Sequence, residues 1–276
     1  MNMNKGEGHK KHHYVPQCYQ RRFSTDKEII KYFDKDTQAL CFKTIADFCQ
    51  IEYLYYLEQD EKPFSLEFDY FSKLIEDKLG SLLKEFDVID GTKDAILFNK
   101  DKKKAVAKQI VLQYMRTPKY RDIKYHNETQ AYLKHICILL DKMGFYAEEL
   151  SYYSDKREYH RRRLCDESEI NEIVDELIDA HWDLWYTDKE EFYTSDNPVV
   201  IIERQDMPVT YCDAIKYFDD IYFPLNSNLL LHIVAGQPVC NKYISIQTIE
   251  QDKVNEINRI IKNKAPHYIL YKNRYY

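Results

Sequence analysis

The segment HHYVPQ places two imidazoles beside a Val-Pro pair. The residue before a proline is restricted to extended backbone, so the ring of His13 is expected to have a fixed direction. A neutral imidazole serves as a metal ligand or as a general base near pH 7. We therefore predict that His13 is a catalytic base or metal ligand, with His12, Gln17 and Arg22 as binding residues. The alternative is that His13 bonds to neighbouring backbone and pins the N-terminal segment.

The segment Thr194-Ser-Asp-Asn-Pro198 offers a carboxylate and an amide between two strand-like runs. Side chains of this kind before a proline form turns in which their oxygens accept backbone N–H groups. The same geometry places polar groups at a strand end, where site residues are often found. We predict Asp196 as a catalytic residue and metal ligand, and Asn197 as a binding residue; a purely structural turn is the alternative. Ser195 lacks a G-x-S-x-G context, which argues against a hydrolase nucleophile.

Two arginines flank the Thr-Pro-Lys-Tyr segment, at Arg116 and Arg121. A guanidinium group can bind phosphate through two parallel hydrogen bonds, so Arg116 could stabilise phosphate charge and Arg121 could bind it. The alternative is an arginine that meets the negative end of a helix dipole. The run KREYHRRR at Lys156–Arg163 interleaves cations with rings, which suits a nucleic-acid strand, but a run this short is more often a solvated helix face.

Composition limits the partners. The formal net charge is -6 and the sequence pI is about 5.9, whereas nucleic-acid-binding domains usually have a pI above about 9, so any nucleic-acid contact must be local. The seven Cys have no C-x-x-C spacing and suit a reducing compartment. The first residues contain no apolar run typical of a signal peptide. We expect a cytoplasmic protein with no membrane partner.

The chain order predicts an α+β fold. Residues 1–11 are expected to form a flexible tail and residues 12–276 a single domain. A β-hairpin is predicted at Glu28–Asp34 and Ala39–Ile45, joined by the turn-forming DKDTQ. Hydrophobic periodicity then predicts a third strand and a series of helices. These are the strand Tyr53–Leu57 and the helices Leu66–Phe86, Ala105–Arg116, Glu128–Met143 and Glu169–Trp182.

The C-terminal third returns to strands. The predicted strands are Phe192–Thr194, Val199–Ile202, Asp220–Phe223, Leu229–Val234 and His267–Tyr271, with one helix at Asp252–Lys262. A helical middle region should therefore pack against an antiparallel or mixed sheet built from N- and C-terminal strands. Because an isolated hairpin is only marginally stable in water, the N-terminal motif should dock onto the C-terminal sheet.

Five segments, in this order, resemble one known family: HHYVPQ with YQRRF, QYMRTPKYR, FYTSDNPVVI, IYFPLN and VNEINRIIKNKAPHYILY. The chain resembles the HYVP-motif family catalogued as domain of unknown function 4238, with a mild departure at Cys18. The resemblance covers nearly the whole chain. It implies one fold unit and supplies no activity.

The chemistry of these residues suggests a metal-dependent nuclease or phosphodiesterase that acts on nucleic acid or a nucleotide, for which defence or mobile-element biology would be a setting. His13 would be the base or a ligand of a divalent metal ion, Asp196 the second ligand, and Arg116 the group that stabilises phosphate charge. The alternative is a non-catalytic protein that binds a protein partner through its surface tyrosines, since Tyr is frequent at binding hot spots. The enzyme hypothesis requires His13, Arg116 and Asp196 to converge in one pocket.

Overall fold

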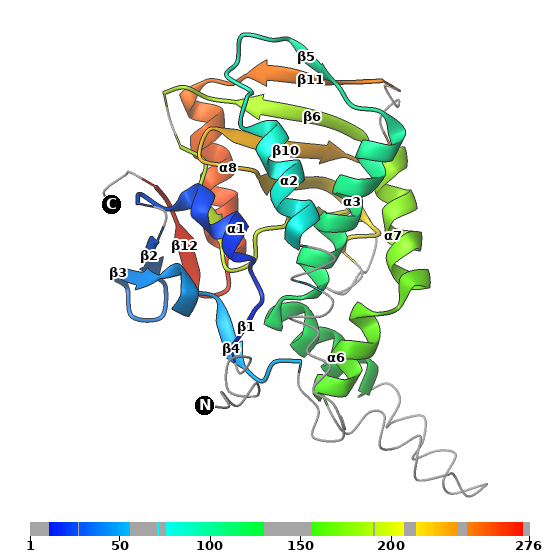
Figure 1. Ribbon diagram of the computed structural model, residues 1–276. Helices are drawn as coiled ribbons and strands as arrows, with labels where there is room; N and C mark the ends of the chain where they lie inside the picture. Colours follow the sequence, from blue (N-terminus) through cyan, green and yellow to red (C-terminus); the bar gives the residue numbers. More distant parts are fainter. Residues whose placement is uncertain are drawn as a thin grey trace, which may run out of the picture.

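The computed structural model describes residues 11–26, 28–55, 71, 76–129, 156–189, 191–206, 214–236 and 242–272. Its strands form three sheets and its helices lie mainly in the middle of the chain, which confirms the predicted α+β class (Figure 1). The helices are α1 Gln17–Gln20, α2 Asp77–Phe86, α3 Lys100–Met115, α6 Lys156–Leu164, α7 Glu167–Asp179 and α8 Gln251–Lys264, with 3₁₀ turns η2 Arg21–Phe23 and η3 Ile45–Asp47. The strands are β1 Lys11–His13, β2 Ile29–Asp34, β3 Ala39–Thr44, β4 Gln50–Glu52, β5 Ala95–Leu97, β6 His181–Tyr186, β7 Thr194–Ser195, β8 Val200–Glu203, β9 Phe218–Pro224, β10 Leu229–Val234, β11 Tyr243–Thr248 and β12 Tyr268–Leu270.

A four-stranded sheet joins the two ends of the chain. Its order is β3-β2-β12-β7, so the C-terminal strand β12 lies between the N-terminal hairpin and β7. Ile269 of β12 is opposite Phe33 on one side and Ser195 on the other. The predicted hairpin and its docking onto C-terminal strands are both confirmed.

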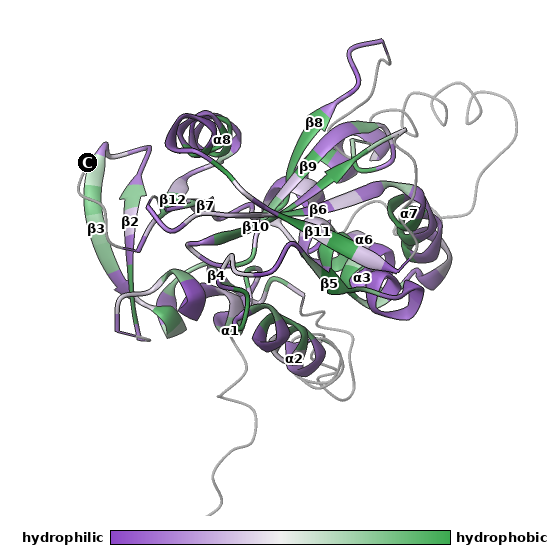
Figure 2. Ribbon diagram, turned by 90° about the horizontal axis from the view of Figure 1, so that it is seen from above, coloured by the Kyte–Doolittle hydropathy of each residue, from purple (hydrophilic) through white to green (hydrophobic). Residues whose placement is uncertain are grey.

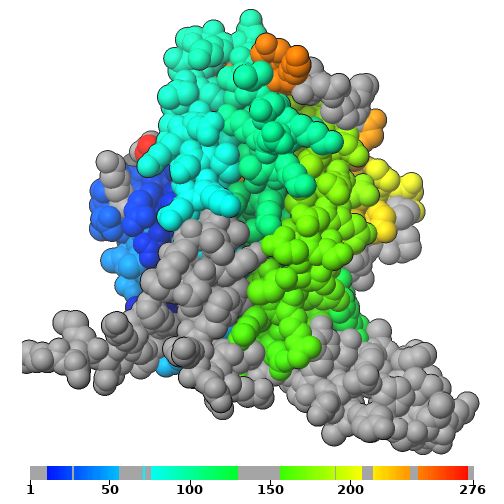
Figure 3. All heavy atoms as spheres, turned by 45° about the vertical axis from the view of Figure 1, so that its right-hand side comes forward, coloured from blue at the N-terminus to red at the C-terminus, as the bar shows by residue number. Residues whose placement is uncertain are grey.

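A six-stranded sheet, β5-β11-β6-β10-β9-β8, forms the centre of the molecule. All its neighbours are antiparallel except β11 and β6, which run parallel, so the sheet is mixed. Helix α8 lies on one side of its strands and α2 on the other (Figure 2). Segments that include α2, α3 and α7 form the outer surface on their side (Figure 3).

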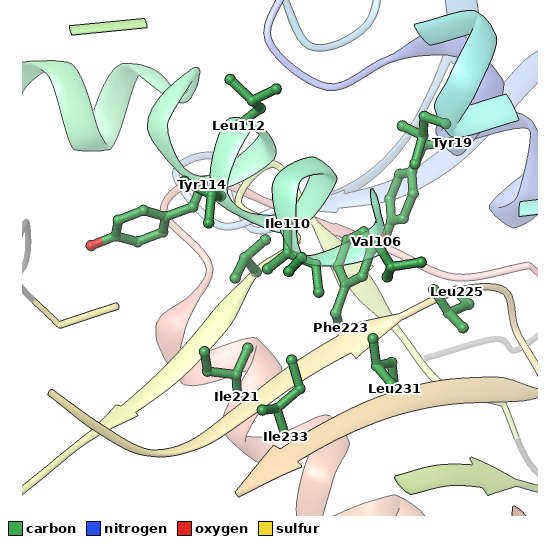
Figure 4. Close-up of a cluster of buried hydrophobic side chains, with 14 of the residues drawn as sticks. Tyr19, Val106, Ile110, Leu112, Tyr114, Ile221, Phe223, Leu225, Leu231 and Ile233 are labelled. Atoms are coloured by element: carbon green, nitrogen blue, oxygen red, sulfur yellow. The ribbon is translucent and has the colours of Figure 1, made fainter. Parts of the chain in front are cut away.

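Side-chain alternation explains why both faces of this sheet are covered. Ile221, Phe223, Leu231 and Ile233 point toward Val106 and Ile110 on α3 (Figure 4), where all of these side chains belong to one buried cluster. The intervening positions of the strands face the other way, and Tyr222 and Leu230 pack in a second cluster with Val254 and Ile257 of α8. A strand that is apolar on both faces is expected where helices cover both sides.

Several predicted boundaries were wrong. The strand predicted at residues 53–57 is replaced by β4, which lies just before it and ends at Glu52. Tyr53 has a left-handed φ of 56°, which ends the extended backbone. Trp182 lies in β6 and not at the end of α7, and β5 and β11 were not predicted. The predicted end of the helix before Pro118 is confirmed, since α3 ends at Met115 with Arg116 as its C-cap. A further helical stretch at residues 118–129 was not predicted as a separate helix, and proline is tolerated at its first position.

Other predictions fall partly outside the described residues. Of the helix predicted at residues 66–86, only the C-terminal half is described, as α2; residues 1–10 and most of the helix predicted at residues 128–143 also lie outside. Among the helices that the structure does describe, none is long and apolar enough to cross a membrane.

Candidate functional site

The guanidinium group of Arg116 connects α3 to the N-terminal strand. It donates to the backbone oxygen of His13, pairs with Glu76 at 3.1 Å, and lies over the ring of Phe71 at 4.2 Å from the centroid. Arg116 is only 1% exposed. A charge buried to this degree needs such partners, and these contacts fix where β1 ends.

The imidazole of His13 is directed at backbone. Its Nε2 lies 3.1 Å from the carbonyl oxygen of Ala46 and 3.5 Å from the amide nitrogen of Gln17. The shorter contact assigns the Nε2 proton to the Ala46 bond, since a carbonyl can only accept. The neighbouring His12 accepts from the backbone N–H of Tyr55 at 3.0 Å through Nδ1 and stacks on its ring. These contacts match the alternative in which the histidines pin the N-terminal segment.

The other predicted binding residues also have partners. Gln17 accepts from Arg21 at 3.2 Å, and Arg22 forms a two-pronged pair with Asp87, whose longer bond is 2.9 Å. Arg121 donates to Asp122 at 2.8 Å. In the Thr194–Pro198 segment, the hydroxyl of Ser195 closes the turn by accepting from the Asn197 N–H at 3.1 Å and donating to the Asn197 carbonyl. The predicted Asx-type turn is therefore built on serine.

Asp196 is a buried carboxyl group at the end of β7, 3% exposed. Its oxygens accept from the backbone N–H groups of His267 at 3.2 Å and Tyr268 at 3.1 Å, which ties β7 to the loop before β12. Burial raises the pKa of Asp196 to about 6, and the two backbone donors oppose this rise. Asp196 therefore changes charge close to neutral pH.

Asp196 lines a cavity of about 480 Å³, which we call the motif cavity. Four segments of the sequence singled out above each contribute to it: Tyr14 follows the two histidines, Thr117–Lys119 follow Arg116, Asp196 follows β7, and Pro266–Tyr268 lead into β12. Neither His13 nor Arg116 is among the lining residues, so the convergence of His13, Arg116 and Asp196 in one pocket that the enzyme hypothesis required is not found, and any chemistry in this cavity must use other residues beside Asp196. The full set is Tyr14, Tyr32, Lys43, Asp47, Phe48, Cys49, Gln50, Ile51, Thr117, Pro118, Lys119, Asp122, Ile123, Asp196, Pro266, His267 and Tyr268.

Aromatic rings form one wall of the motif cavity. The ring of Phe48 lies 4.6 Å from that of Tyr32 and 5.3 Å from that of Tyr268, and the two tyrosines meet edge to face at 5.2 Å. Burial raises the pKa of the Tyr14 hydroxyl, with further contributions from its neighbours Cys49 and Asp196. The wall is thus apolar, with hydroxyl groups at its edge.

Lys119 brings an amine to the same cavity. Its Nζ lies 3.4 Å from the carbonyl oxygen of Lys264. Burial lowers the pKa of Lys119, the charge of Lys264 lowers it further, and Asp196 acts in the opposite direction. The cavity thus holds an acid whose pKa is raised and an amine whose pKa is lowered. Such a pair is the arrangement expected of proton-transfer groups.

The described residues favour neither a reactive thiol nor a metal site in this cavity. Burial, followed by the charge of Asp196, raises the pKa of the Cys49 thiol well above its usual value, which makes a thiolate nucleophile unfavourable. Cys18, Cys41, Cys49 and Cys165 are free, and the other three cysteines lie outside the described residues. Within those residues no group of three or more His, Cys, Asp or Glu could hold a metal ion. The metal roles of His13 and Asp196 stay predictions.

Sequence reasoning identified the segments of this site more readily than its individual residues. Tyr14 and Thr117 line the cavity, whereas their neighbours His13 and Arg116 meet behind it. Successive side chains point to opposite sides of a strand and to different sides of a helix, so a contact of one residue says little about the next. The signal available in the sequence was the tyrosine of the HYVP motif and the lysine between Arg116 and Arg121.

Comparison with known proteins gives one match. A family model described as "Protein of unknown function (DUF4238)" matches residues 11–275. Searches among curated proteins and among solved structures found no match.

Proposed function

The chain belongs to the DUF4238 family of proteins of unknown function, and we propose that it binds a nucleotide in the motif cavity and hydrolyses a phosphodiester bond there, with Asp196 as the proton acceptor. The observation that carries this proposal is the convergence of four distant sequence segments on one cavity that contains Asp196 and Lys119. Titratable groups whose pKa values are shifted and that line one cavity are candidates for a functional site.

The substrate class follows from the lining. The rings of Tyr32, Phe48 and Tyr268 offer faces and edges on which a planar base can stack. Lys43 and Lys119 bring positive charge for a phosphate group, and two of the three carboxylates in the lining are paired with cations outside it, Asp47 with Lys11 and Asp122 with Arg121 and Lys156. The volume of about 480 Å³ lies within the range of roughly 300–1,000 Å³ that is usual for small-molecule sites.

The reaction assigns one role to each group. Above pH 6 the Asp196 carboxylate accepts a proton from a water molecule as the water oxygen bonds to phosphorus. The phosphorus–oxygen ester bond breaks, and the leaving oxygen takes a proton from the Lys119 ammonium, whose lowered pKa favours this transfer. Arg116 and His13 act as positioning residues, since their bond fixes the strand that leads into Tyr14.

A binding function without catalysis is the second candidate. It is favoured by the two backbone N–H groups that Asp196 already accepts, because they give this carboxylate a structural reason to be buried. In this case the motif cavity binds a nucleotide and does not hydrolyse it.

Paired measurements of binding and turnover test the two candidates. Wild type, Asp196→Asn and Lys119→Met are assayed for hydrolysis of cyclic and linear phosphodiesters and for nucleotide binding by calorimetry. Catalysis predicts that Asp196→Asn still binds but loses turnover by about 10²–10⁴-fold. Matched controls are Asp206→Asn and Lys104→Met, at exposed positions that do not line the cavity. Wild-type binding without turnover supports the second candidate when Lys119→Met weakens that binding, and a wild type that binds no nucleotide overturns both.

A further inference from the structure

A second cavity, of about 740 Å³, shares no lining residue with the motif cavity. It is formed by α1 and η2, by α2, by the end of β6, by the turn between β9 and β10, and by the residues after β12. We call it the basic cavity. Its lining residues are Cys18, Arg21, Arg22, Gly80, Lys84, Asp87, Ile89, Asp90, Tyr186, Asn226, Ser227, Asn228 and Lys272.

Positive charge is concentrated in the basic cavity. Four lining residues are cationic and two are anionic, so the formal charge of the lining is 4 − 2 = +2, although the whole chain carries -6. A concave surface with one predominant sign of charge raises the local concentration of oppositely charged ligands. The ligand of this cavity is therefore expected to be an anion.

The two carboxylates are already engaged within the fold. Asp87 is bonded to Arg22 through both of its oxygens. Asp90 accepts from the backbone N–H of Thr92 at 3.1 Å and from its hydroxyl at 2.6 Å. Neither carboxylate neutralises Lys84 or Lys272, and these two lysines form no ion pair with any residue in the described part of the chain.

The neutral lining is held in place by its own bonds. Asn226 accepts from the backbone N–H of Asn228 at 2.8 Å, and the amide of Asn228 donates to the carbonyl oxygen of Thr187 at 2.8 Å. The ring of Tyr186 lies directly against Gly91: a Cβ atom at that position would be 2.5 Å from the ring. The φ of Gly91, +76°, is also one that glycine adopts readily. A fixed ring thus lies beside unpaired lysines.

We propose that the basic cavity binds a small phosphate-bearing anion. Lys84, Lys272 and Arg21 supply the charge, with Arg21 free to exchange its 3.2 Å bond to Gln17 for a phosphate oxygen. The ring of Tyr186 offers a surface for a base when the phosphate belongs to a nucleotide. This site is independent of the chemistry proposed for the motif cavity.

Calorimetric titration of the full chain with pyrophosphate, ADP and adenosine tests this proposal. The protein carries Lys119→Met to weaken the motif cavity, and substitution of the two lysines of the basic cavity, Lys84 and Lys272, assigns the binding that remains. We expect pyrophosphate and ADP to bind, adenosine not to bind, and added salt to weaken binding because exposed charges are screened. Tighter binding of ADP than of pyrophosphate identifies a nucleotide site, whereas equal binding identifies a site for phosphate alone.

The decisive variant is Lys84→Ala with Lys272→Ala, for which we expect at least about a tenfold loss of affinity, the equivalent of about 1.4 kcal/mol. The matched control is Lys78→Ala, since Lys78 is exposed on the same helix but does not line the cavity. Thermal melting verifies that each variant is folded. Unchanged affinity in the double variant, or no anion binding by the parent protein, overturns the proposal. Failure of nucleotide hydrolysis in the wild type leaves it unaffected.

Discussion

Asp196 serves the fold and the proposed chemistry through a single buried carboxyl group. Its two backbone donors hold the loop before β12, and one side of the group faces the motif cavity. Burial is the larger influence on its proton affinity and raises its pKa. The folded protein therefore binds this proton more tightly than the unfolded chain does, and the consequence can be measured.

Asp196 should make stability fall as pH rises. Its pKa is about 6 in the folded state against an ordinary value of 3.8, so its contribution is complete below pH 3.8 and is lost as pH rises to about 6. A shift of this size corresponds to roughly 3 kcal/mol. Urea unfolding of wild type and Asp196→Asn from pH 4 to pH 7 measures the difference. The wild type should lose stability relative to the variant over this range; parallel curves would show that the proton is not held in this way.

His160 should make stability change with pH in the opposite direction, so that stability falls as pH falls. Burial lowers its pKa to about 3 from 6.5, so the unfolded chain takes up the proton first and stability is lost as pH falls from 6.5 toward 3. Its Nε2 donates to the carbonyl oxygen of Met115 at 2.8 Å. His160→Phe should lose about 1–3 kcal/mol at pH 8 through that bond but should be less sensitive to acid. A variant that loses stability between pH 7 and pH 5 as steeply as wild type contradicts the prediction.

At the scale of elements, α6 shows how a charged run can be built into a fold. The run KREYHRRR was open to two interpretations, a nucleic-acid track or a solvated helix face. The structure places Tyr159 and His160 in the interior. Arg163 donates to Glu128 at 2.7 Å and to Glu169 at 3.0 Å, so it connects α6 to its neighbours. Part of the positive charge is therefore neutralised within the protein.

Arg163 should matter more for stability than the adjacent Arg162. Arg163→Ala removes the bonds of Arg163 to Glu128 and Glu169 in a partly buried setting and leaves Lys124 as the cation that both carboxylates share, for which we expect a loss of about 1–3 kcal/mol. Arg162 is exposed and pairs with Glu158 one helical turn earlier, and an i,i+4 pair of this kind contributes about 0.3–0.5 kcal/mol. Chemical denaturation of both variants compares them directly. Equal losses would mean that the Arg163 network is not a structural connection.

The secondary-structure predictions were right where a local sequence pattern determines the element. The hairpin at β2 and β3 was read from its strands and its turn, and Asp166 caps α7 by accepting from Ser168 and Glu169. The boundary between α7 and β6 was missed because Trp182 continues the helical spacing of the preceding apolar residues. That boundary is set by pairing of β6 with β10 and β11, and long-range pairing overrides local pattern.

At the scale of the whole molecule, the candidate site depends on contacts that no local pattern encodes. The motif segments were recognised, but their meeting point required the sheet in which β12 lies between β2 and β7. Strand β12 and the loop before it also supply the two backbone donors of Asp196 and the ring of Tyr268. The last strand thus links the fold of the N-terminal hairpin to the geometry of the cavity.

Removal of β12 should therefore abolish the folded state and ligand binding together. A chain that ends at Ala265 leaves β2 and β7 without their common neighbour and leaves the Asp196 carboxyl group buried without its donors, a loss of several times the roughly 1–3 kcal/mol of one unsatisfied group. The expected result is a chain with no cooperative unfolding transition by circular dichroism. The control ends at Lys272 and retains every strand of this sheet. A shortened chain that unfolds cooperatively and still binds a nucleotide would show that the two ends of the protein do not form one unit.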